Sequence, residues 1–554
     1  MKRALKIVGI IVAVLIVIAI AIPFFIDANS FRPKIESDLS ATLGRPVKVG
    51  NLSLSLLSGS VAADDISIAD DPAFSKTPFV QAKSLKVGVE LIPLIFSKSL
   101  NVTDMTLNDP EISLVRSENG DKWNYSSLGG TNKSAAQPAS ANAPASKSAP
   151  PAPSTNEKSE PATSTSSSGA SLSVAKLNVN NGRLTLSRVG GKEKPRVYDK
   201  VNISLSDFSF TSSFPFSMTA RLPGDGTLKI DGKAGPIDPN DAAKTPLQAK
   251  VVVQKMNLAE SGFIDPAAGI SGIADFEGTV TSDGHEAKTS GTLRATNLQV
   301  VKKGSPAGKP VQVNYTVNFD LAKQTGTILQ CDISTGKAVA HLTGTYDAHG
   351  SVTSVNLKVN GQGMPVDDLE TILPALGVVL PPKSQLKGGV LNTEMAIVGP
   401  VDRLVTTGTV RMENTTLANF SLGSKLSAIS SLSGKSAATG NDTTIQNFSS
   451  DVRVAPDGTR ADKINLTVPS IGVVTGAGTV SPSNELAFKL NANVGGMGAI
   501  PIVVSGTTSD PKFLPDVKGM ASGLLKGALN GKNIPGGQNP VNNLTGLFKK
   551  KPPQ

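Results

Sequence analysis

The sequence predicts a mainly β protein: an N-terminal transmembrane helix followed by a long, curled antiparallel sheet that leaves a groove, built from repeated units with a few short helices. Three observations support this prediction. An uncharged apolar run fills residues 7–26, apolar and polar residues then alternate along most of the chain, and a Ser/Ala/Pro-rich stretch interrupts the alternation. The 554 residues include 53 Gly and 37 Pro, a composition typical of short strands and turns.

The apolar run is long enough to cross a bilayer. As a helix, Ile7–Ile26 would rise about 30 Å, the thickness of the hydrocarbon core. A basic cluster precedes the run, which predicts a cytoplasmic N-terminus and places everything after Asp27 on the far side. The cluster comprises Lys2, Arg3 and Lys6. A cleaved signal peptide with Ala19–Ala21 at its cleavage site is the alternative, but the run continues to Ile26, beyond the usual h-region of about 7–15 residues.

A short helix is expected directly after the anchor. Asn29 or Ser30 would cap it, Pro33 suits its first turn, and Gly44 would end it. Its apolar residues fall four apart on one face: Phe31, Ile35 and Leu39. This face either rests on the membrane surface or plugs the end of the following sheet. The narrow stripe favours the second interpretation.

Composition divides the chain into six segments. They are residues 1–6 (cytoplasmic), 7–26 (transmembrane), 27–130 (an N-terminal β region), 131–170 (a disordered linker), 171–515 (a repeated β-sheet groove region) and 516–554 (a flexible basic tail). The linker is almost entirely Ser, Ala, Pro, Thr and Asn, which bury too little apolar surface to offset the entropy of ordering. With strands and turns of about ten to fifteen residues, 171–515 would hold roughly 25–30 strands.

The clearest strands have one apolar face, which is the candidate functional surface. Ser, Thr, Asn and Lys occupy the other face, as in a sheet that is wet on one side. Either the interior is filled completely, or a groove remains in which acyl chains gain about 0.8 kcal/mol per buried CH₂. The alternation of apolar and polar residues is the same in both cases and does not distinguish them. The candidate groove residues are Val311, Val313, Tyr315, Val317, Phe319, Leu321, Ile464, Leu466, Val468, Leu486, Phe488 and Leu490.

An internal repeat supports one elongated architecture. Gly272–Gly291 and Gly389–Gly408 have equal lengths, and both run into the pattern Thr-Ser/Thr-Gly-Thr-Leu/Val-Arg. Met256 and Met364 precede the two copies, and each begins a short apolar helical stretch that is longer in the second, Val366–Gly377. Stacked repeats bury their faces against each other. Chance similarity between Gly/Thr-rich strands is the alternative.

No motif for catalysis, nucleotide binding or metal binding occurs, so neither enzyme activity nor a cofactor is expected. The single cysteine, Cys331, fits a half-buried core position, and the three histidines lack ligand spacing. Asp64-Asp65 and Asp70-Asp71 lack the spacing of a calcium loop and are expected to be solvated or to cap turns. The net charge of +10 is spread along the chain, which favours anionic lipid over nucleic acid as a neighbour.

Both ends of the chain resemble the AsmA family of bacterial envelope proteins. In Asp27–Gly130 the resemblance is carried by IDANSFRPKIESDLSATLGRPVKVGNLSLSLLSG, ADDISIADDPAFSKTPFVQAKSLKVGVELIPLIF and GDKWNYSSLG. Later, LETILPALGVVLPPKSQLKGGVLNTEMAIVGPVDRLVTTGTVRMENTTLANFSLG and VSGTTSDPKFLPDV resemble the family's C-terminal region. The resemblance implies a single-pass inner-membrane protein with its bulk in the periplasm and a role in envelope biogenesis. It also implies a kinship with bridge-like lipid-transfer proteins, and it carries over no catalytic residues.

Two functions are therefore in contention. The first is binding or moving phospholipid or another envelope lipid along an apolar β-groove, with the inner membrane and other envelope proteins as partners. The second is a non-enzymatic structural role in outer-membrane protein assembly. A continuous apolar lining that is open at an end would favour the first. A filled interior with an exposed polar patch would favour the second.

Overall fold

The fold is described from a computed structural model of the chain. The described residues are 28–55, 59–90, 102–119, 122–128, 173–191, 195–238, 244–262, 264, 268–350, 352–425, 440–493 and 499–516. The expected anchor (7–26), the expected linker (131–170) and nearly all of the expected tail (516–554) lie outside them. In the part of the chain that is described, no helix combines the length and apolar character needed to cross a membrane.

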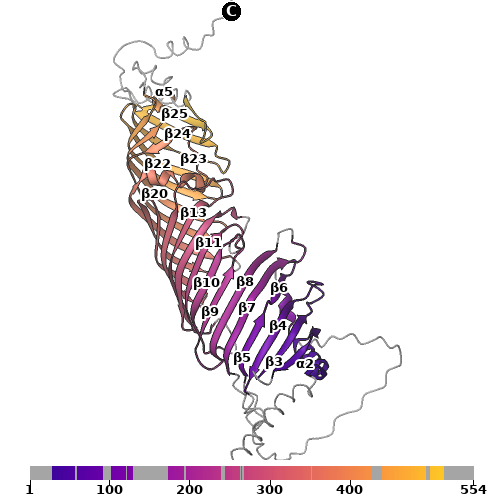
Figure 1. Cartoon of the computed structure of the whole chain (residues 1–554). Coiled ribbons are helices and arrows are strands. Elements are labelled where there is room, and N and C mark those ends of the chain that lie inside the picture. The colour runs from indigo at the N-terminus through magenta and orange to yellow at the C-terminus, as the bar shows by residue number, and fades with distance from the viewer. Residues whose placement is uncertain are drawn as a thin grey trace, which may run out of the picture. The chain divides into compact units, whose positions relative to one another are not determined.

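The chain is mainly β, as predicted, with 26 strands and a few short helices among the described residues (Figure 1). The described residues of region 171–515 form β7 to β26. That is fewer strands than expected, because individual strands run to as many as 16 residues. The described residues fall into two compact units: unit 1 draws on 1–303 and 312–329, and unit 2 on 304–311 and 330–554.

Unit 1 contains the first thirteen strands. They are β1 Val47–Lys48, β2 Leu52–Ser55, β3 Ser60–Ile68, β4 Val80–Val89, β5 Val102–Asn108, β6 Glu111–Arg116, β7 Ser173–Arg188, β8 Arg196–Ser209, β9 Phe214–Arg221, β10 Thr227–Ala234, β11 Leu247–Asn257, β12 Ser271–Ser282 and β13 Glu286–Gln299. From β7 to β13 each strand pairs antiparallel with the next. The residues of β14 (Val311–Asp320) and β15 (Thr325–Thr335) are divided between the units.

Unit 2 contains the later strands and three short helical segments. The strands are β16 Ala338–Asp347, β17 Ser354–Pro365, β18 Gln385–Lys387, β19 Val390–Pro400, β20 Val405–Ala418, β21 Thr443–Ala455, β22 Gly458–Val468, β23 Gly472–Val480, β24 Leu486–Asn493, β25 Ala499–Gly506 and β26 Pro511–Pro515. The helical segments are α4 Val366–Glu370, η5 Leu373–Leu376 and α5 Leu422–Lys425. All described pairings in this unit are antiparallel.

The expectation of a purely antiparallel sheet is wrong at one place. Strands β5 and β6 both pair with β7, and both pairings are parallel. A parallel neighbour needs a long crossover connection. Residues 117–172, between β6 and β7, provide enough chain for one. The other described strand pairings of unit 1 are antiparallel.

The helical segment at the start of unit 1 closes the first edge of its sheet. Helix α2 (Arg32–Leu43) follows the turn η1 (Ala28–Phe31) and ends, as predicted, at Gly44 in the left-handed conformation. The prediction that Asn29 or Ser30 caps the helix is wrong: α2 begins after Phe31 without a side-chain cap. Instead, side-chain oxygens of this segment accept backbone N–H groups along the edge: Asn29 from Leu52 at 2.8 Å, Glu36 from Val49 at 2.8 Å and Ser40 from Val47 at 2.9 Å.

A buried polar cluster ties three distant segments of unit 1 together. The Arg45 guanidinium donates to Asp70 Oδ1 at 3.2 Å, to Ser127 Oγ at 2.9 Å and to the Asn124 carbonyl. The Asn124 amide donates to Asp70 Oδ2 at 2.8 Å, and Ser127 donates to Asp71 at 2.9 Å. The Asp70 carboxylate is therefore buried in a paired state rather than solvated at a turn, because residues 25 and 54 positions away satisfy it.

The internal repeat is present in the backbone. In the first copy the Leu258 N–H donates to the Gly272 carbonyl at 2.9 Å, and in the second Val366 donates to Gly389 at 3.2 Å. A register shift precedes Met256 in one copy and Met364 in the other. The residue at the bulge makes an equivalent hydrogen bond in each copy. Lys255 N donates to the Asp275 side chain at 2.8 Å in the first copy, and Gly363 N donates to the Asn392 side chain at 2.7 Å in the second. Chance similarity would not reproduce these hydrogen bonds.

The expected helical stretches differ between the two copies. After Met364 the chain forms α4 and η5. This helical stretch ends at Gly377, whose φ is 76°, as predicted for Val366–Gly377. After Met256 the expected helix is absent from the described residues. Strand β11 continues to Asn257, and the chain then turns, with Ser261 N donating to the Asn257 carbonyl at 2.8 Å.

The buried cluster generates a stability prediction. Arg45→Ala leaves the Asp70 carboxylate buried without its cation, which we expect to cost about 3–5 kcal/mol. Denaturant unfolding and hydrogen exchange of residues 28–128 would measure the loss. Arg183→Ala is the control, because Arg183 pairs with Glu111 and Asp199 at an exposed site and should leave the midpoint nearly unchanged. Equal effects of the two changes would contradict the role assigned to the cluster.

Candidate functional site

An unbroken line of apolar residues and glycines crosses eleven strands of unit 1. Each member is the direct cross-strand partner of the next, from β2 to β13. We call this line apolar row 1. Its members are Leu52, Ala63, Leu85, Leu107, Val179, Ile203, Met218, Ile230, Val251, Gly278 and Gly291. Direct partners share a face of the sheet, so the row is a continuous apolar strip.

The adjacent line of partners points to the opposite face and is polar. It comprises Ser53, Ala62, Lys86, Thr106, Asn178, Ser204, Ser217, Asp231, Lys250, Thr279 and Ser290. Apart from Ala62, every side chain in this line is polar or charged. The sheet of unit 1 therefore has one apolar and one hydrophilic face, as its alternation predicts.

Unit 2 carries an equivalent line, which we call apolar row 2. It crosses ten strands from β16 to β26, again through direct partners. Its members are Leu342, Val359, Met395, Gly408, Val452, Ala461, Gly478, Phe488, Val504 and Phe513. No polar side chain interrupts it.

Most side chains in both rows are half-buried. From Ala63 to Val251 every member of apolar row 1 is in this state, while polar neighbours such as Lys86, Thr219 and Lys229 are exposed. Fully buried clusters occur at the ends of the described sheet. One contains Val47, Val49 and Leu52, and the other contains Val474, Ala492, Ile502 and Val504. Between those ends, the apolar strip keeps surface that a further apolar molecule could cover.

Among the predicted residues along and just after β14, Tyr315 lies on the apolar face of unit 1. The Tyr315 ring stacks on Phe276, with ring centroids 6.3 Å apart, and burial raises the pKa of the Tyr315 hydroxyl. Phe276 is two positions from Gly278 of apolar row 1 and therefore shares its face. The intervening Asn314 accepts a hydrogen bond from Thr292 at 2.8 Å on the polar face. Val313, Val317, Phe319 and Leu321 are half-buried, and Val311 is fully buried.

The predicted residues of β22 and β24 lie around the C-terminal core. Leu466, Leu486, Phe488 and Leu490 all pack against the cluster of Val474, Ala492, Ile502 and Val504. Ile464 and Val468 are fully buried. This end of unit 2 is therefore a filled core, and the half-buried part of apolar row 2 lies over β16–β24.

Sequence reasoning missed most members of the two rows. The signal was present locally, since Phe216-Ser217-Met218 and Leu228-Lys229-Ile230 both alternate. Which residue stands opposite which depends on cross-strand register, and register is not visible within one strand. The glycines in the rows gave no hydrophobic signal at all.

Glycines in the rows lie beneath large apolar side chains. A Cβ on Gly278 would stand 2.7 Å from Phe276 Cζ and 2.8 Å from the Ser290 carbonyl oxygen. In unit 2 a Cβ on Gly478 would overlap the ring of its partner Phe488. The aromatic rings thus fill the gaps that the glycines leave and keep each row continuous.

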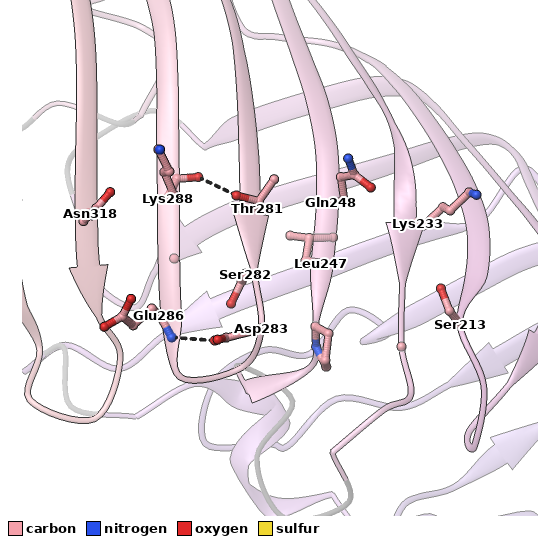
Figure 2. A pocket seen from close by; sticks show the side chains of 13 residues that line it. Ser213, Lys233, Leu247, Gln248, Thr281, Ser282, Asp283, Glu286, Lys288 and Asn318 are labelled. Atoms are coloured by element: carbon pink, nitrogen blue, oxygen red, sulfur yellow. Dashed lines mark hydrogen bonds between the residues drawn. The ribbon is translucent and has the colours of Figure 1, made fainter.

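A depression of about 530 Å³ in unit 1 has a different character (Figure 2). A polar line of partners crosses it: Lys233, Gln248, Thr281 and Lys288. Asp283 and Glu286 lie beside it at the β12–β13 turn. The pKa of Asp283 is lowered because its carboxylate accepts the backbone N–H groups of Glu286 and His285 at 2.7 and 2.8 Å. This carboxylate therefore serves the turn.

No metal or nucleophile site emerges from the part of the chain that is described. It contains no group of three or more His, Cys, Asp or Glu side chains that could hold a metal ion. Cys331 is half-buried, as predicted, and burial together with Asp332 raises its thiol pKa, which disfavours the reactive thiolate. His341 Nδ1 lies 2.7 Å from Asp332 Oδ1, an exposed surface pair.

Replacing one glycine by valine tests the close packing in apolar row 1. Valine normally favours a strand centre, but Gly278→Val would drive its side chain into Phe276 and should destabilise unit 1 by about 1–3 kcal/mol. Thr279→Val is the matched control on the exposed face and should be nearly neutral. Denaturant midpoints of the full chain would report both. A stabilised Gly278→Val variant would show that the ring does not occupy this space.

Comparison with known proteins identifies one relationship. No curated protein and no solved structure matches the chain. The family model described as "AsmA family" matches residues 1–296, more than half of the 554 residues. The match takes in the N-terminal region, whose resemblance the sequence had shown, and extends through apolar row 1. The chain belongs to the AsmA family.

Proposed function

We propose that the protein is anchored in the bacterial inner membrane by residues 7–26 and binds or moves phospholipid along its apolar rows in envelope biogenesis. Its strands lie in the periplasm, and it acts without catalysis. AsmA family membership and the large β fold are consistent with envelope biogenesis. The continuity of the two apolar rows is the single observation that carries the lipid-binding part of the proposal.

The length of a row suits acyl chains. Neighbouring strands are about 4.8 Å apart, so eleven strands extend apolar row 1 over roughly 48 Å along the sheet. One leaflet's share of a bilayer core is about 15 Å. The row is therefore about three acyl chains long, and a lipid lying along it would meet no polar side chain between Leu52 and Gly291.

The half-buried state of the row supplies the driving force. An acyl chain lying on side chains such as Ile203, Met218 and Ile230 removes water from both surfaces, at about 0.8 kcal/mol per buried CH₂. The free energy gained by burying apolar surface does not depend on direction. A lipid could therefore shift from one strand to the next without breaking hydrogen bonds, which suits transport better than tight binding at one point.

The polar residues of the opposite face explain how such a sheet can be exposed to water on one side. The polar line through Lys86, Asp231 and Lys250 remains solvated while the apolar line is covered. The excess positive charge, spread along the chain, suits anionic headgroups close by.

A pair of single substitutions tests lipid binding. Met218→Asp places a carboxylate in apolar row 1, where covering it with an acyl chain costs several kcal/mol. We expect severalfold less phospholipid to co-purify with this full-length variant, measured by native mass spectrometry and lipid extraction. Thr219→Asp adds the same charge to the adjacent exposed position and should retain the lipid.

The outcomes separate the two candidate functions. Both variants must first keep the melting transition of the unaltered chain. Lipid loss confined to Met218→Asp supports the groove. If the unaltered protein carries no phospholipid and takes none from vesicles, the carrier role is wrong and a structural role in outer-membrane protein assembly takes its place.

A further inference from the structure

Helix α2 turns two polar residues toward the protein, together with Leu43 at its last position, and leaves its other apolar residues facing outward. Glu36 and Ser40 face the sheet edge, where they accept the N–H groups of Val49 and Val47. The Val49 hydrogen bond is also the main reason that the Glu36 pKa is lowered. The apolar stripe is left uncovered: Phe31, Ile35 and Leu39 are 56%, 36% and 41% exposed. A surface helix of a soluble domain normally has the reverse arrangement.

The position of the stripe in the chain indicates what covers it. The 20-residue apolar run ends at Ile26, and Phe31 follows five residues later. Five extended residues reach at most about 17 Å. The headgroup layer is only about 5–8 Å thick on each side of the core. If Ile7–Ile26 spans the bilayer, the first turn of α2 cannot leave the neighbourhood of the membrane surface.

We propose that α2 lies on the surface of the membrane that holds the anchor, with Phe31, Ile35 and Leu39 inserted at the boundary between headgroups and acyl chains. The helix then serves as a dock for unit 1. Its polar side holds the sheet edge by hydrogen bonds, and its apolar side holds the bilayer.

This docking places the start of apolar row 1 at the membrane. The row begins at Leu52, and the Leu52 N–H is held by Asn29 in the turn that leads into α2. Leu52 itself is buried, so phospholipid leaving the outer leaflet of the inner membrane would reach the row beside this end, at its first half-buried members, Ala63 and Leu85. The role as an entry point rests on the proposed lipid-binding function, whereas the contact of α2 with the membrane does not.

Lipid quenching of a site-specific probe tests the contact. The full chain is placed in nanodiscs after Cys331→Ser, and a fluorophore is attached through Ile35→Cys. Ser37→Cys is the matched control, because two residues turn an α-helix by about 200° and Ser37 is also exposed. Brominated phosphatidylcholine should quench the probe at position 35 by about half, and the probe at 37 by far less.

Several outcomes would overturn the inference. Equal quenching at both positions would show that the stripe does not face the lipid. Shielding from water at position 35 without bromolipid quenching would mean that protein covers the stripe. The triple variant Phe31→Ser, Ile35→Ser, Leu39→Ser provides a further check: its melting transition should be unchanged, and a large loss would identify the stripe as core.

Phospholipid content measured on the detergent-purified chain, before it is placed in nanodiscs, separates this inference from the function on which it partly rests. Co-purifying lipid without quenching at position 35 refutes the dock and leaves the lipid-binding groove. Quenching at position 35 in a chain that carries no lipid supports the dock and refutes the groove.

Discussion

Cross-strand register is the constraint on which the rest of the structure depends. Side chains alternate with period two, so a slip of one residue between β9 and β10 would move Met218 and Ile230 to opposite faces and break the apolar strip. The register shifts in the strands of apolar row 1 do not involve the residues of the row itself. Between β11 and β12 the shift lies between Val253 and Met256, two residues beyond Val251, and the Lys255 hydrogen bond to Asp275 holds it there.

Each end of the described sheet is completed by a different device. At the start, side-chain oxygens of Asn29, Glu36 and Ser40 replace the missing neighbour strand, which blocks the edge to further pairing. At the finish, Leu422 of α5 joins Ile500 and Phe513 in packing against the buried core of β23–β25. Full burial is thus concentrated at these two places, and the half-buried surface of each row is a property of the long strands of its own unit.

The sequence carried the strand pattern but not the long-range contacts. Leu486, Phe488 and Leu490 were recognisable as one face because β24 alternates strictly. The parallel pairing of β5 and β6 with β7 was not foreseeable, because the connection between them holds no local signal of direction. Nor was the Arg45–Asp70–Asn124 cluster, whose members are far apart in sequence and are polar residues expected at the surface. Asn29 looked like a helix cap, and a tertiary partner, Leu52 N–H, took its side chain instead.

The most direct test of the account is to ask whether one face of the sheet, and not the other, touches lipid in living cells. A photo-crosslinking amino acid is placed at Ile230, in apolar row 1, or at Lys229, the next residue on the exposed polar face. After irradiation of cells, adducts on the full-length protein are identified by mass spectrometry. The account predicts phospholipid adducts from position 230 and few or none from 229. Adducts of equal yield at both positions, or protein adducts alone at 230, would contradict it.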